Sequence, residues 1–252
     1  MQKINKKIFL VAGGTGGHLF PAIAVAQRDK KNEYFFIIDN RVEEYLKKFD
    51  FKYSIISSSR LEKNFFKIPL VFPKIFLGIL KSIYLIYKFK PSLIIGFGGY
   101  TSIPTILAAK ILRIKTLLHE QNALMGRTNR LLSRLCDSLA VGFKNTKFSK
   151  KNSHYTGTPT RLFKKKNIRS RKMRVLVVGG SQGAKIFSKI IPNILSKIPY
   201  NITKKIKIIQ QVRSEDKSKL LSQYKKMEVD FVLKSFFIDL QNQIKLIAKR
   251  EN

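Results

Sequence analysis

The feature that most constrains the fold is an apolar strand that runs directly into a glycine-rich loop and then into a helix. The apolar run Ile8–Ala12 leads into Gly13–Gly17, and His18 opens an alanine-rich, helix-forming segment. Glycines let the backbone adopt positive φ and approach a ligand closely. The N-terminus of the following helix favours an anion, typically phosphate. The unit predicts an α/β fold with an anion site at the loop, and a plain tight turn is the alternative.

Two further loops of this kind follow strands later in the chain. The first is GFGGY, residues 96–100, and the second is GGSQG, residues 179–183; each precedes a helix-forming segment. Ligands of open α/β sheets bind at the carboxyl ends of the strands. The loops of the first half, together with HEQN at residues 119–122, are therefore expected to line one cleft.

Short runs rich in β-branched and aromatic residues alternate with helical segments. We expect strands at Ile8–Ala12, Tyr34–Asp39, Tyr53–Ser57, Ser92–Phe97, Thr116–Glu120, Ser138–Phe143, Arg174–Val178, Ile206–Val212 and Val229–Phe236, and helices that include Val42–Phe49 and Pro104–Leu112. Continuous apolar strands separated by helices are typical of a parallel sheet covered on both faces. The fold class is therefore α/β, with doubly wound, Rossmann-like parallel sheets.

A basic stretch divides the chain into two such units. Residues 164–172 read KKKNIRSRK, which is typical of a linker. We expect one domain at residues 1–163 and a second at residues 173–252. Only three strands are expected after the linker, so the second sheet is expected to be incomplete and to have an open edge.

The glycine loop does not fit the two best-known phosphate-binding patterns. The dinucleotide fingerprint G-x-G-x-x-G would start at Gly14, but its third glycine falls on Leu19. The loop that ends in Gly-Lys-Ser/Thr requires a lysine, which is absent here. A nicotinamide-dependent oxidoreductase, with Asp39 on the ribose, is thus only a remote alternative.

The net charge of the chain indicates which classes of partner it could bind. The chain of 252 residues carries a formal net charge of +35, which suggests nucleic acid or an anionic membrane. The lysines are scattered, however, so a lysine-rich proteome explains most of the excess. Because no nucleic-acid motif or interleaved stacking aromatics are present, nucleic-acid binding ranks last. The single cysteine, Cys136, fits a reducing compartment, and the short apolar run after the N-terminus is not expected to be a signal peptide.

The segment at residues 68–89 is rich in apolar residues and has lysines at Lys74, Lys81 and Lys88. A seven-residue spacing drifts only about 20° per repeat on a helix, so the lysines form one stripe. The apolar residues beside it are Phe76, Ile79, Leu80, Ile83 and Tyr87. This pattern favours a helix that lies in the interface of an anionic membrane, although an amphipathic helix packed on the sheet is the alternative.

Five motifs together resemble the MurG family of bacterial glycosyltransferases. In order, they are AGGTGGHLFPAIAVA, GFGGYTSIPTILAA, LHEQNALMGRTNRLLS, TGTPTR and RVLVVGGSQGAK. The resemblance covers essentially the whole chain. It implies a GT-B architecture and a peripheral position on the cytoplasmic side of the plasma membrane. The implied reaction is inverting transfer of N-acetylglucosamine from UDP-N-acetylglucosamine to undecaprenyl-pyrophosphoryl-N-acetylmuramyl-pentapeptide (lipid I). Its product is lipid II for peptidoglycan.

The same resemblance implies which residues bind substrate. The implied donor-binding positions are Thr15, Gly16, Gly17, Asn122, Arg161, Ser181 and Ile238. Gly98, Gly99 and Tyr100 match the acceptor side, although an aromatic residue at a strand end is more often simple packing. No cofactor is implied. We find no acidic pair or His/Cys cluster with metal-ligand spacing, so no metal site is expected; helix N-termini can stabilise the departing diphosphate instead.

His18 is the candidate general base, since an imidazole titrates near neutral pH. Two alternatives stay open: His18 only hydrogen-bonds phosphate or caps the loop, or Glu120 is the base. His154 lies in no motif, and we expect it at the surface.

One departure from the family bears on activity. The family continues with a glycine- and glutamate-bearing region that holds uridine and ribose, and the chain stops before it, at KLIAKREN. The sequence therefore suggests a truncated product with weak donor binding. The corresponding alternatives are an inactive fragment, or a non-catalytic, membrane-bound acceptor domain that needs a separate donor-binding chain.

Overall fold

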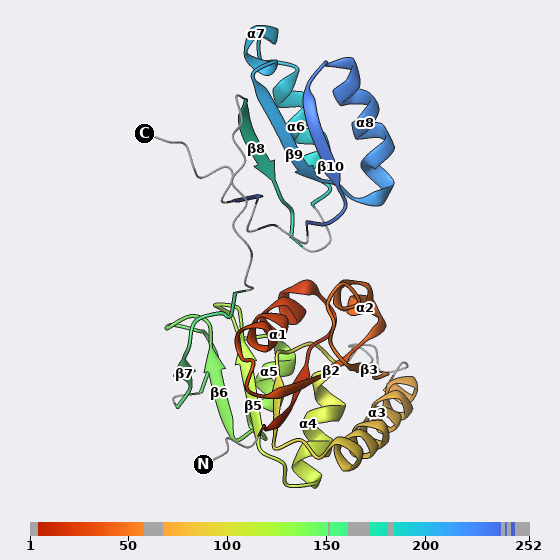
Figure 1. The fold of residues 1–252 in the computed structure, drawn as a ribbon, viewed down its shortest axis with the longest axis vertical. Coiled ribbons are helices and arrows are strands. Elements are labelled where there is room, and N and C mark those ends of the chain that lie inside the picture. Colours follow the sequence, from red (N-terminus) through yellow and green to blue (C-terminus); the bar gives the residue numbers. More distant parts are fainter. Residues whose placement is uncertain are drawn as a thin grey trace. The chain divides into compact units, whose positions relative to one another are not determined.

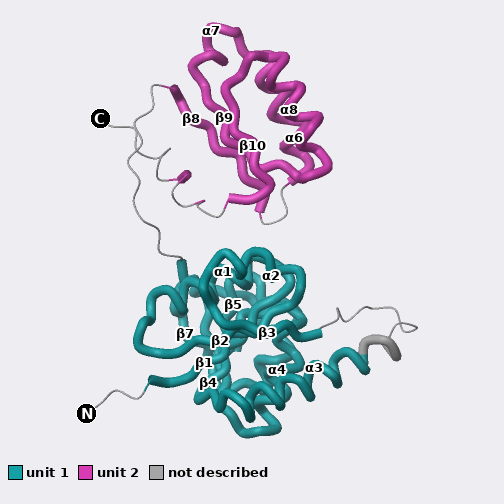
Figure 2. The backbone as a smooth tube through the Cα atoms, turned by 45° about the vertical axis from the view of Figure 1, so that its right-hand side comes forward, with its two compact units in different colours: residues 1–162 teal, residues 163–252 magenta. Residues whose placement is uncertain are grey.

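The computed structural model describes residues 5–57, 68–150, 152–160, 172–180, 184–237, 240 and 243–244. The chain divides into unit 1, Met1–Leu162, and unit 2, Phe163–Asn252 (Figure 2). The domain boundary expected from the sequence is residue 163. Three expected donor-binding residues, Arg161, Ser181 and Ile238, lie outside the described residues, as does most of the expected linker.

Unit 1 is built on a seven-stranded sheet in which every pair of neighbours is parallel (Figure 1). The strands are β1 (Lys7–Val11), β2 (Glu33–Ile38), β3 (Tyr53–Ile55), β4 (Leu93–Gly96), β5 (Thr116–Glu120), β6 (Ser138–Val141) and β7 (His154–Tyr155). Their order is β3-β2-β1-β4-β5-β6-β7. The first six strands were expected within two residues of these bounds. The seventh strand was not expected, because two residues are too few to show a pattern. This strand contains His154, which is exposed as expected.

Helices cover both faces of this sheet. They are α1 (Gly16–Arg28), α2 (Asn40–Leu46), α3 (Ile68–Phe89), α4 (Ser102–Ile111) and α5 (Arg127–Leu132). Alternate residues of β1 belong to two separate cores. Ile8 and Leu10 pack with buried residues of α1 and α2, whereas Phe9 and Val11 pack with buried residues of α3, α4 and α5. A strand that is buried on both sides explains why the apolar run in β1 does not alternate with polar residues.

Unit 2 contains a three-stranded parallel sheet in the order β10-β9-β8. Its elements are β8 (Met173–Val177), α6 (Phe187–Leu195), α7 (Tyr200–Thr203), β9 (Ile206–Gln211), the 3-10 helix η2 (Ser214–Asp216), α8 (Lys217–Lys226) and β10 (Asp230–Lys234). Tyr224 of α8 is fully buried in its core. Within the described residues β8 pairs only with β9, and the open edge expected from the sequence stays a prediction.

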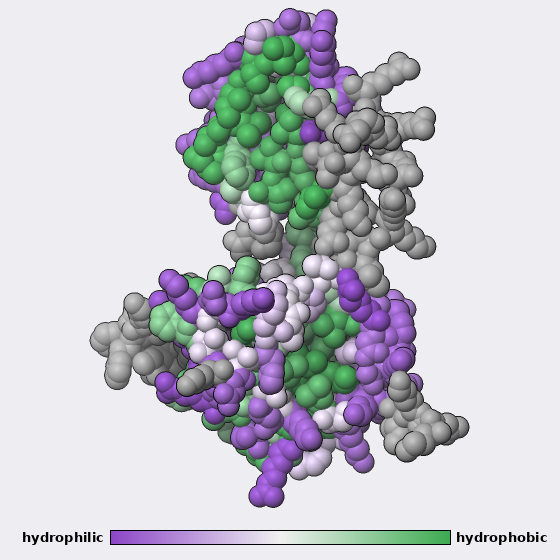
Figure 3. Space-filling view, turned by 90° about the vertical axis from the view of Figure 1, so that its left-hand side faces the viewer, coloured by the Kyte–Doolittle hydropathy of each residue, from purple (hydrophilic) through white to green (hydrophobic). Residues whose placement is uncertain are grey.

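Hydrophobic side chains are also exposed on unit 2. Ile186, Ile190 and Ile194 are spaced four residues apart along α6 and its N-terminal cap, and all three are exposed. Figure 3 shows a broad hydrophobic area on this unit. Residues four apart lie on one face of a helix, so α6 presents an apolar stripe outward as well as packing into the core.

Candidate active site at the glycine loops

The loops that follow β1 and β4 meet at the carboxyl edge of the unit 1 sheet. Gly99 has φ 80°, and a Cβ atom added to it would lie 2.4 Å from the carbonyl oxygen of Gly13. A Cβ atom added to Gly13 would lie 2.0 Å from Oγ1 of Thr101. Both distances are too short for any side chain. Glycine is therefore required at Gly99, which lies against the backbone of Gly13, and at Gly13, which lies against the side chains of Thr101 and Asp39.

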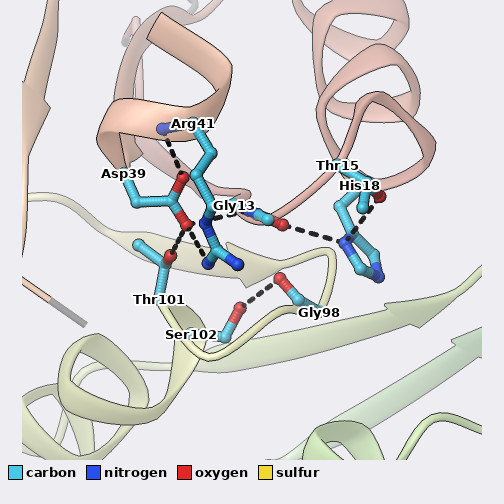
Figure 4. Close-up of polar contacts among 9 residues, drawn as sticks. Gly13, Thr15, His18, Asp39, Arg41, Gly98, Thr101 and Ser102 are labelled. Carbon is cyan, nitrogen blue, oxygen red and sulfur yellow. Dashed lines mark hydrogen bonds and ion pairs between the residues drawn. The ribbon is translucent and has the colours of Figure 1, made fainter. Parts of the chain in front are cut away.

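Asp39 fastens the two loops together from the end of β2 (Figure 4). Its Oδ2 atom accepts hydrogen bonds from the backbone N–H of Gly14 at 2.8 Å and from the hydroxyl of Thr101 at 2.9 Å. The Arg41 guanidinium pairs with the same oxygen at 2.6 Å. Oδ1 accepts from the backbone N–H of Arg41, which caps α2. The buried carboxylate thus caps α2 and also holds the two loops together.

His18 lies beside these two loops, in the first turn of α1. Its Nδ1 atom is 2.9 Å from the carbonyl oxygen of Gly13 and 3.4 Å from Oγ1 of Thr15. A carbonyl oxygen only accepts, so Nδ1 carries the proton in that bond, and the neutral ring leaves Nε2 free to accept. Nε2 lies next to Gly98, where an added Cβ atom would be 3.2 Å away. His18 therefore spans the two loops.

The surroundings of His18 lower its pKa below 6.5, because burial disfavours the charged ring. The hydrogen bond to Gly13 opposes this shift, as do the negative charges of Glu120 and Asp39, while the Arg41 charge adds to it. The ring is therefore neutral at pH 7 and can accept a proton.

Both carboxylate oxygens of Glu120 accept hydrogen bonds from other groups of the chain. One carboxylate oxygen accepts from the backbone N–H and side-chain amide of Asn122, at 2.9 and 2.8 Å. The other accepts from the backbone N–H of Gly126 and the amide of Asn129, both at 2.9 Å. The residue is only 1% exposed. This geometry gives Glu120 the role of shaping the loop after β5 and orienting Asn122, and leaves it poorly placed as a base.

The first turn of α1 contains the other expected donor-binding residues of this loop. Thr15 is the N-cap residue of α1 and makes no side-chain capping bond, and Gly16 and Gly17 begin the helix. The first N–H groups of a helix have no partner within it. No acidic residue lies in the first turn, so no side chain of that turn offsets the positive partial charge at this end of α1.

Of the three residues expected on the acceptor side, Gly98 and Gly99 differ from Tyr100 in their surroundings. Gly98 and Gly99 have φ of 97° and 80° and form the wall of the loop opposite His18. The hydroxyl of Ser102 donates to the Gly98 carbonyl and holds the turn. Tyr100 is half-buried and packs against the core beneath α3 and α4. This contact agrees with the packing alternative, and a place for Tyr100 on the acceptor side stays a prediction.

Sequence reasoning missed the structural role of Asp39 and the part of Arg41 and Asn129. It considered Asp39 only as a ribose ligand of the oxidoreductase alternative. A signal was present, since an aspartate between a strand and a helix is a typical N-cap. The bonds of Asn129 had no such signal, because they join residues nine and ten positions away through the fold.

The expected membrane-facing helix is α3, and it packs on α4 with one face. Lys74, Lys81 and Lys88 are all exposed, as are Phe76, Leu80 and Tyr87. Ile79 and Ile83 are instead partly buried against the core, so their assignment to the outer face is wrong. The exposed apolar residues that the sequence missed are Phe72, Leu77 and Tyr84. In the described part of the chain, no helix is long and apolar enough to cross a membrane.

Among the described residues, no group of three or more His, Cys, Asp or Glu side chains comes together.

Comparison with known proteins identifies both units. Residues 8–141 match the glycosyltransferase family 28 N-terminal domain, and residues 174–248 match the glycosyltransferase family 28 C-terminal domain. Two similar proteins are UDP-N-acetylglucosamine–N-acetylmuramyl-(pentapeptide) pyrophosphoryl-undecaprenol N-acetylglucosamine transferases. The protein from Rickettsia bellii is 35% identical, with 95% of this chain and 71% of the relative covered. The protein from Rickettsia canadensis is 38% identical over the same shares.

Solved structures of similar fold agree with this family assignment. The crystal structure of Acinetobacter baumannii MurG has a TM-score of 0.63 at 25% identity, with 94% of this chain and 70% of the other covered. The Neisseria meningitidis UDP-GlcNAc 2-epimerase shares the fold, with a TM-score of 0.61 at 13% identity over 96% and 75% of the two chains. The expected fold class, two Rossmann-like α/β units of GT-B type with a shorter second one, is confirmed.

Proposed function

The chain belongs to glycosyltransferase family 28, with the MurG transferases as its relatives, and from this premise we propose that it transfers N-acetylglucosamine. The donor is UDP-N-acetylglucosamine, and the acceptor is the lipid-linked N-acetylmuramyl-pentapeptide, lipid I. The product is lipid II, a precursor of peptidoglycan, which links the activity to cell-wall biogenesis and to cell shape and division.

The observation that carries the catalytic part is the free Nε2 atom of His18 beside Gly98. In the proposed step, Nε2 removes the proton from the acceptor hydroxyl as its oxygen bonds to the anomeric carbon of the donor. The bond from that carbon to the diphosphate breaks, and the electron pair leaves with UDP. The N–H groups of Thr15, Gly16 and Gly17 at the start of α1 are suitable donors to diphosphate oxygens.

Glu120 supports this site indirectly. It fixes the amide of Asn122 at the carboxyl end of β5, and Asn122 is proposed to contact the donor. Arg161, Ser181 and Ile238 are proposed donor contacts by resemblance alone. The acceptor is proposed to lie along Gly98 and Gly99.

We further propose that α3 binds the membrane that holds the acceptor. The exposed face of α3 combines Phe72, Phe76 and Leu80 with the stripe formed by Lys74, Lys81 and Lys88. Apolar side chains enter the interface while lysines meet anionic headgroups. The protein would then be peripheral, on the cytoplasmic side of the plasma membrane, where the nucleotide sugar is available.

Two other functions are less well supported. A nicotinamide-dependent oxidoreductase would need Asp39 free for a ribose, but its carboxylate is occupied by Gly14, Thr101 and Arg41. A non-catalytic acceptor domain that needs a separate donor-binding chain is consistent with the geometry of unit 1, and the activity assay below distinguishes it. Nucleic acid is not a proposed partner.

The test is a transfer assay with radiolabelled UDP-N-acetylglucosamine and a soluble lipid I analogue. Because the sequence suggests weak donor binding, the donor is supplied at high concentration; we then expect product with the wild-type protein and a loss of about 10²–10⁴-fold in kcat for His18→Ala. No product even then would favour the inactive-fragment alternative. His154→Ala, on the exposed strand β7, is the matched control and should leave kcat unchanged. Acceptor binding without any transfer would favour the acceptor-domain alternative.

A further inference from the structure

We propose that Asp39 is a positioning residue for His18 and acts on the imidazole through the peptide group that joins Gly13 to Gly14. The inference rests on the proposed role of His18 as the base. It assigns a second role to the Asp39 carboxylate, which holds the two loops together: this carboxylate also sets the basicity of the His18 imidazole.

The geometry is a chain of two hydrogen bonds through one peptide group (Figure 4). On one side, the Gly13 carbonyl oxygen accepts from Nδ1–H of His18 at 2.9 Å. On the other side, the N–H of Gly14 donates to Oδ2 of Asp39 at 2.8 Å. The carbonyl and the N–H belong to the same planar unit, with delocalised electrons. Asp39 and His18 are therefore linked as the carboxylate and histidine of a catalytic triad are, with one peptide group inserted.

Hydrogen bonds in a chain polarise one another. A carboxylate at the N–H end increases the negative partial charge on the carbonyl oxygen at the other end. The stronger acceptor holds Nδ1–H more tightly, keeps the tautomer with a free Nε2, and stabilises the imidazolium that forms when Nε2 accepts a proton. The proton stays on the ring and never reaches Asp39.

Among the described residues, three charged groups act on His18 from the surrounding elements: Glu120 at the end of β5, Asp39 at the end of β2 and Arg41 in α2. The negative charges of Glu120 and Asp39 raise the pKa of His18, and Arg41 lowers it. Arg41 also binds Oδ2 of Asp39 and thereby competes for the charge that the relay uses. This opposition predicts effects of opposite sign for the two neighbours.

The glycine requirement fits the same arrangement. A side chain on Gly13 would collide with both Thr101 and Oδ2 of Asp39, at 2.0 and 2.5 Å. Only a bare peptide group can lie between the carboxylate and the imidazole at hydrogen-bonding distance from both.

The test is an NMR titration of labelled histidine in the full chain, which contains three histidines; His18→Ala identifies the signal. Asp39→Asn should lower the pKa of His18 by about 0.5 or more, and the acid limb of the pH–kcat profile should move by the same amount while KM for the donor changes little. Arg41→Gln should raise the pKa of His18.

Two controls separate this role from a structural one. Thr101→Val removes a bond to Asp39 but keeps the peptide relay, so it should leave the pKa of His18 unchanged. Glu43→Gln removes a carboxylate from α2 that pairs with Lys47 and Tyr53 instead, and it should also have no effect. An unchanged pKa in Asp39→Asn, or an equal shift in Thr101→Val, would overturn the proposal. If Asp39→Asn does not fold, Arg41→Gln decides by the proton shift of Nδ1–H of His18, because the Arg41 charge also acts on the pKa directly: a downfield move supports the relay, and no change overturns it.

The titration needs no substrate, so it is independent of the proposed function. A shifted pKa together with full turnover in His18→Ala would refute the role of His18 as base and leave the coupling intact. An inactive His18→Ala together with an unshifted pKa in Asp39→Asn would refute the relay alone.

Discussion

The Nδ1 atom of His18 lies 2.9 Å from the carbonyl oxygen of Gly13, so one ring nitrogen is tied to the loop that it helps to shape. The other nitrogen faces the neighbouring glycine loop at Gly98. An imidazole held in this way has one defined tautomer when neutral, and the proposed role of His18 as a base requires that neutral form.

The pH dependence of activity should therefore have its acid limb below pH 6.5. Burial lowers the pKa of His18 from that value, and the proposed base works only when unprotonated. As pH falls through the lowered pKa, kcat/KM should decline about tenfold per pH unit, and it should be flat between that point and pH 7. A pH–rate profile of the wild-type protein checks this. An acid limb above pH 7 would contradict the neutral, buried ring.

The same shift has a consequence for stability. The folded-state pKa of His18 lies below the unfolded value, so the folded protein resists protonation. The stabilisation is complete above the unfolded pKa, near 6.5, and declines as pH falls from there toward the folded-state pKa. His18→Gln should reduce the dependence of the unfolding free energy on pH in this window, measured by urea denaturation. An unchanged slope would show that other groups account for it.

Gly13→Ala should destabilise unit 1, because the added methyl group would collide with Thr101 and Asp39. We expect a loss of about 1–3 kcal/mol in the free energy of unfolding, typical of overpacking. Gly17→Ala, at the start of α1, is the matched control, since its Cβ atom would meet Thr15 at an ordinary 3.4 Å. Thermal unfolding of both variants gives the comparison, and equal melting temperatures would refute the close contact of the loops.

Glu120→Gln should weaken the loop after β5. The carboxylate accepts four hydrogen bonds, and an amide can accept on only one of its two terminal atoms. Leaving buried donors unpaired costs about 1–3 kcal/mol, and a displaced Asn122 should weaken donor binding. Urea denaturation and calorimetry with UDP-N-acetylglucosamine measure the two effects. A variant with wild-type stability would show that the carboxylate is not the centre of this network.

The sequence predicted much of this architecture, because the information was local. The apolar run of β1 and the glycine loop after it lie within ten residues, and their pattern reads directly as strand, loop and helix. The predictions that failed concern features that tertiary packing decides. Ile79 and Ile83 follow the same helical period as Phe76 and Leu80, and only the packing of α3 on α4 turns them inward.

The site was predicted less completely than the fold for a related reason. His18 stands in a motif, so its candidacy was visible. Its dependence on Asp39 was not, because the two residues are joined through the backbone of Gly13 and Gly14 and not by any contact of their own side chains. Glu120 could be identified as an acidic residue near the loops, but only its four bonds show that it has no free oxygen.

The basic stripe on α3 leads to the last prediction. Replacing Lys74, Lys81 and Lys88 by Gln should weaken binding to vesicles that contain anionic lipid, since each lysine near the surface contributes about 1 kcal/mol. Three such losses correspond to roughly a hundredfold fall in affinity at low salt. The salt dependence of binding should flatten as well, because fewer charges are left to screen. The matched control replaces the exposed residues Lys30, Lys48 and Lys115, which lie elsewhere on unit 1. If sedimentation with vesicles shows equal losses for both triple variants, net charge alone attracts the protein and α3 has no special part. A loss confined to the α3 variant would place the membrane at the face where Phe72, Phe76 and Leu80 are exposed.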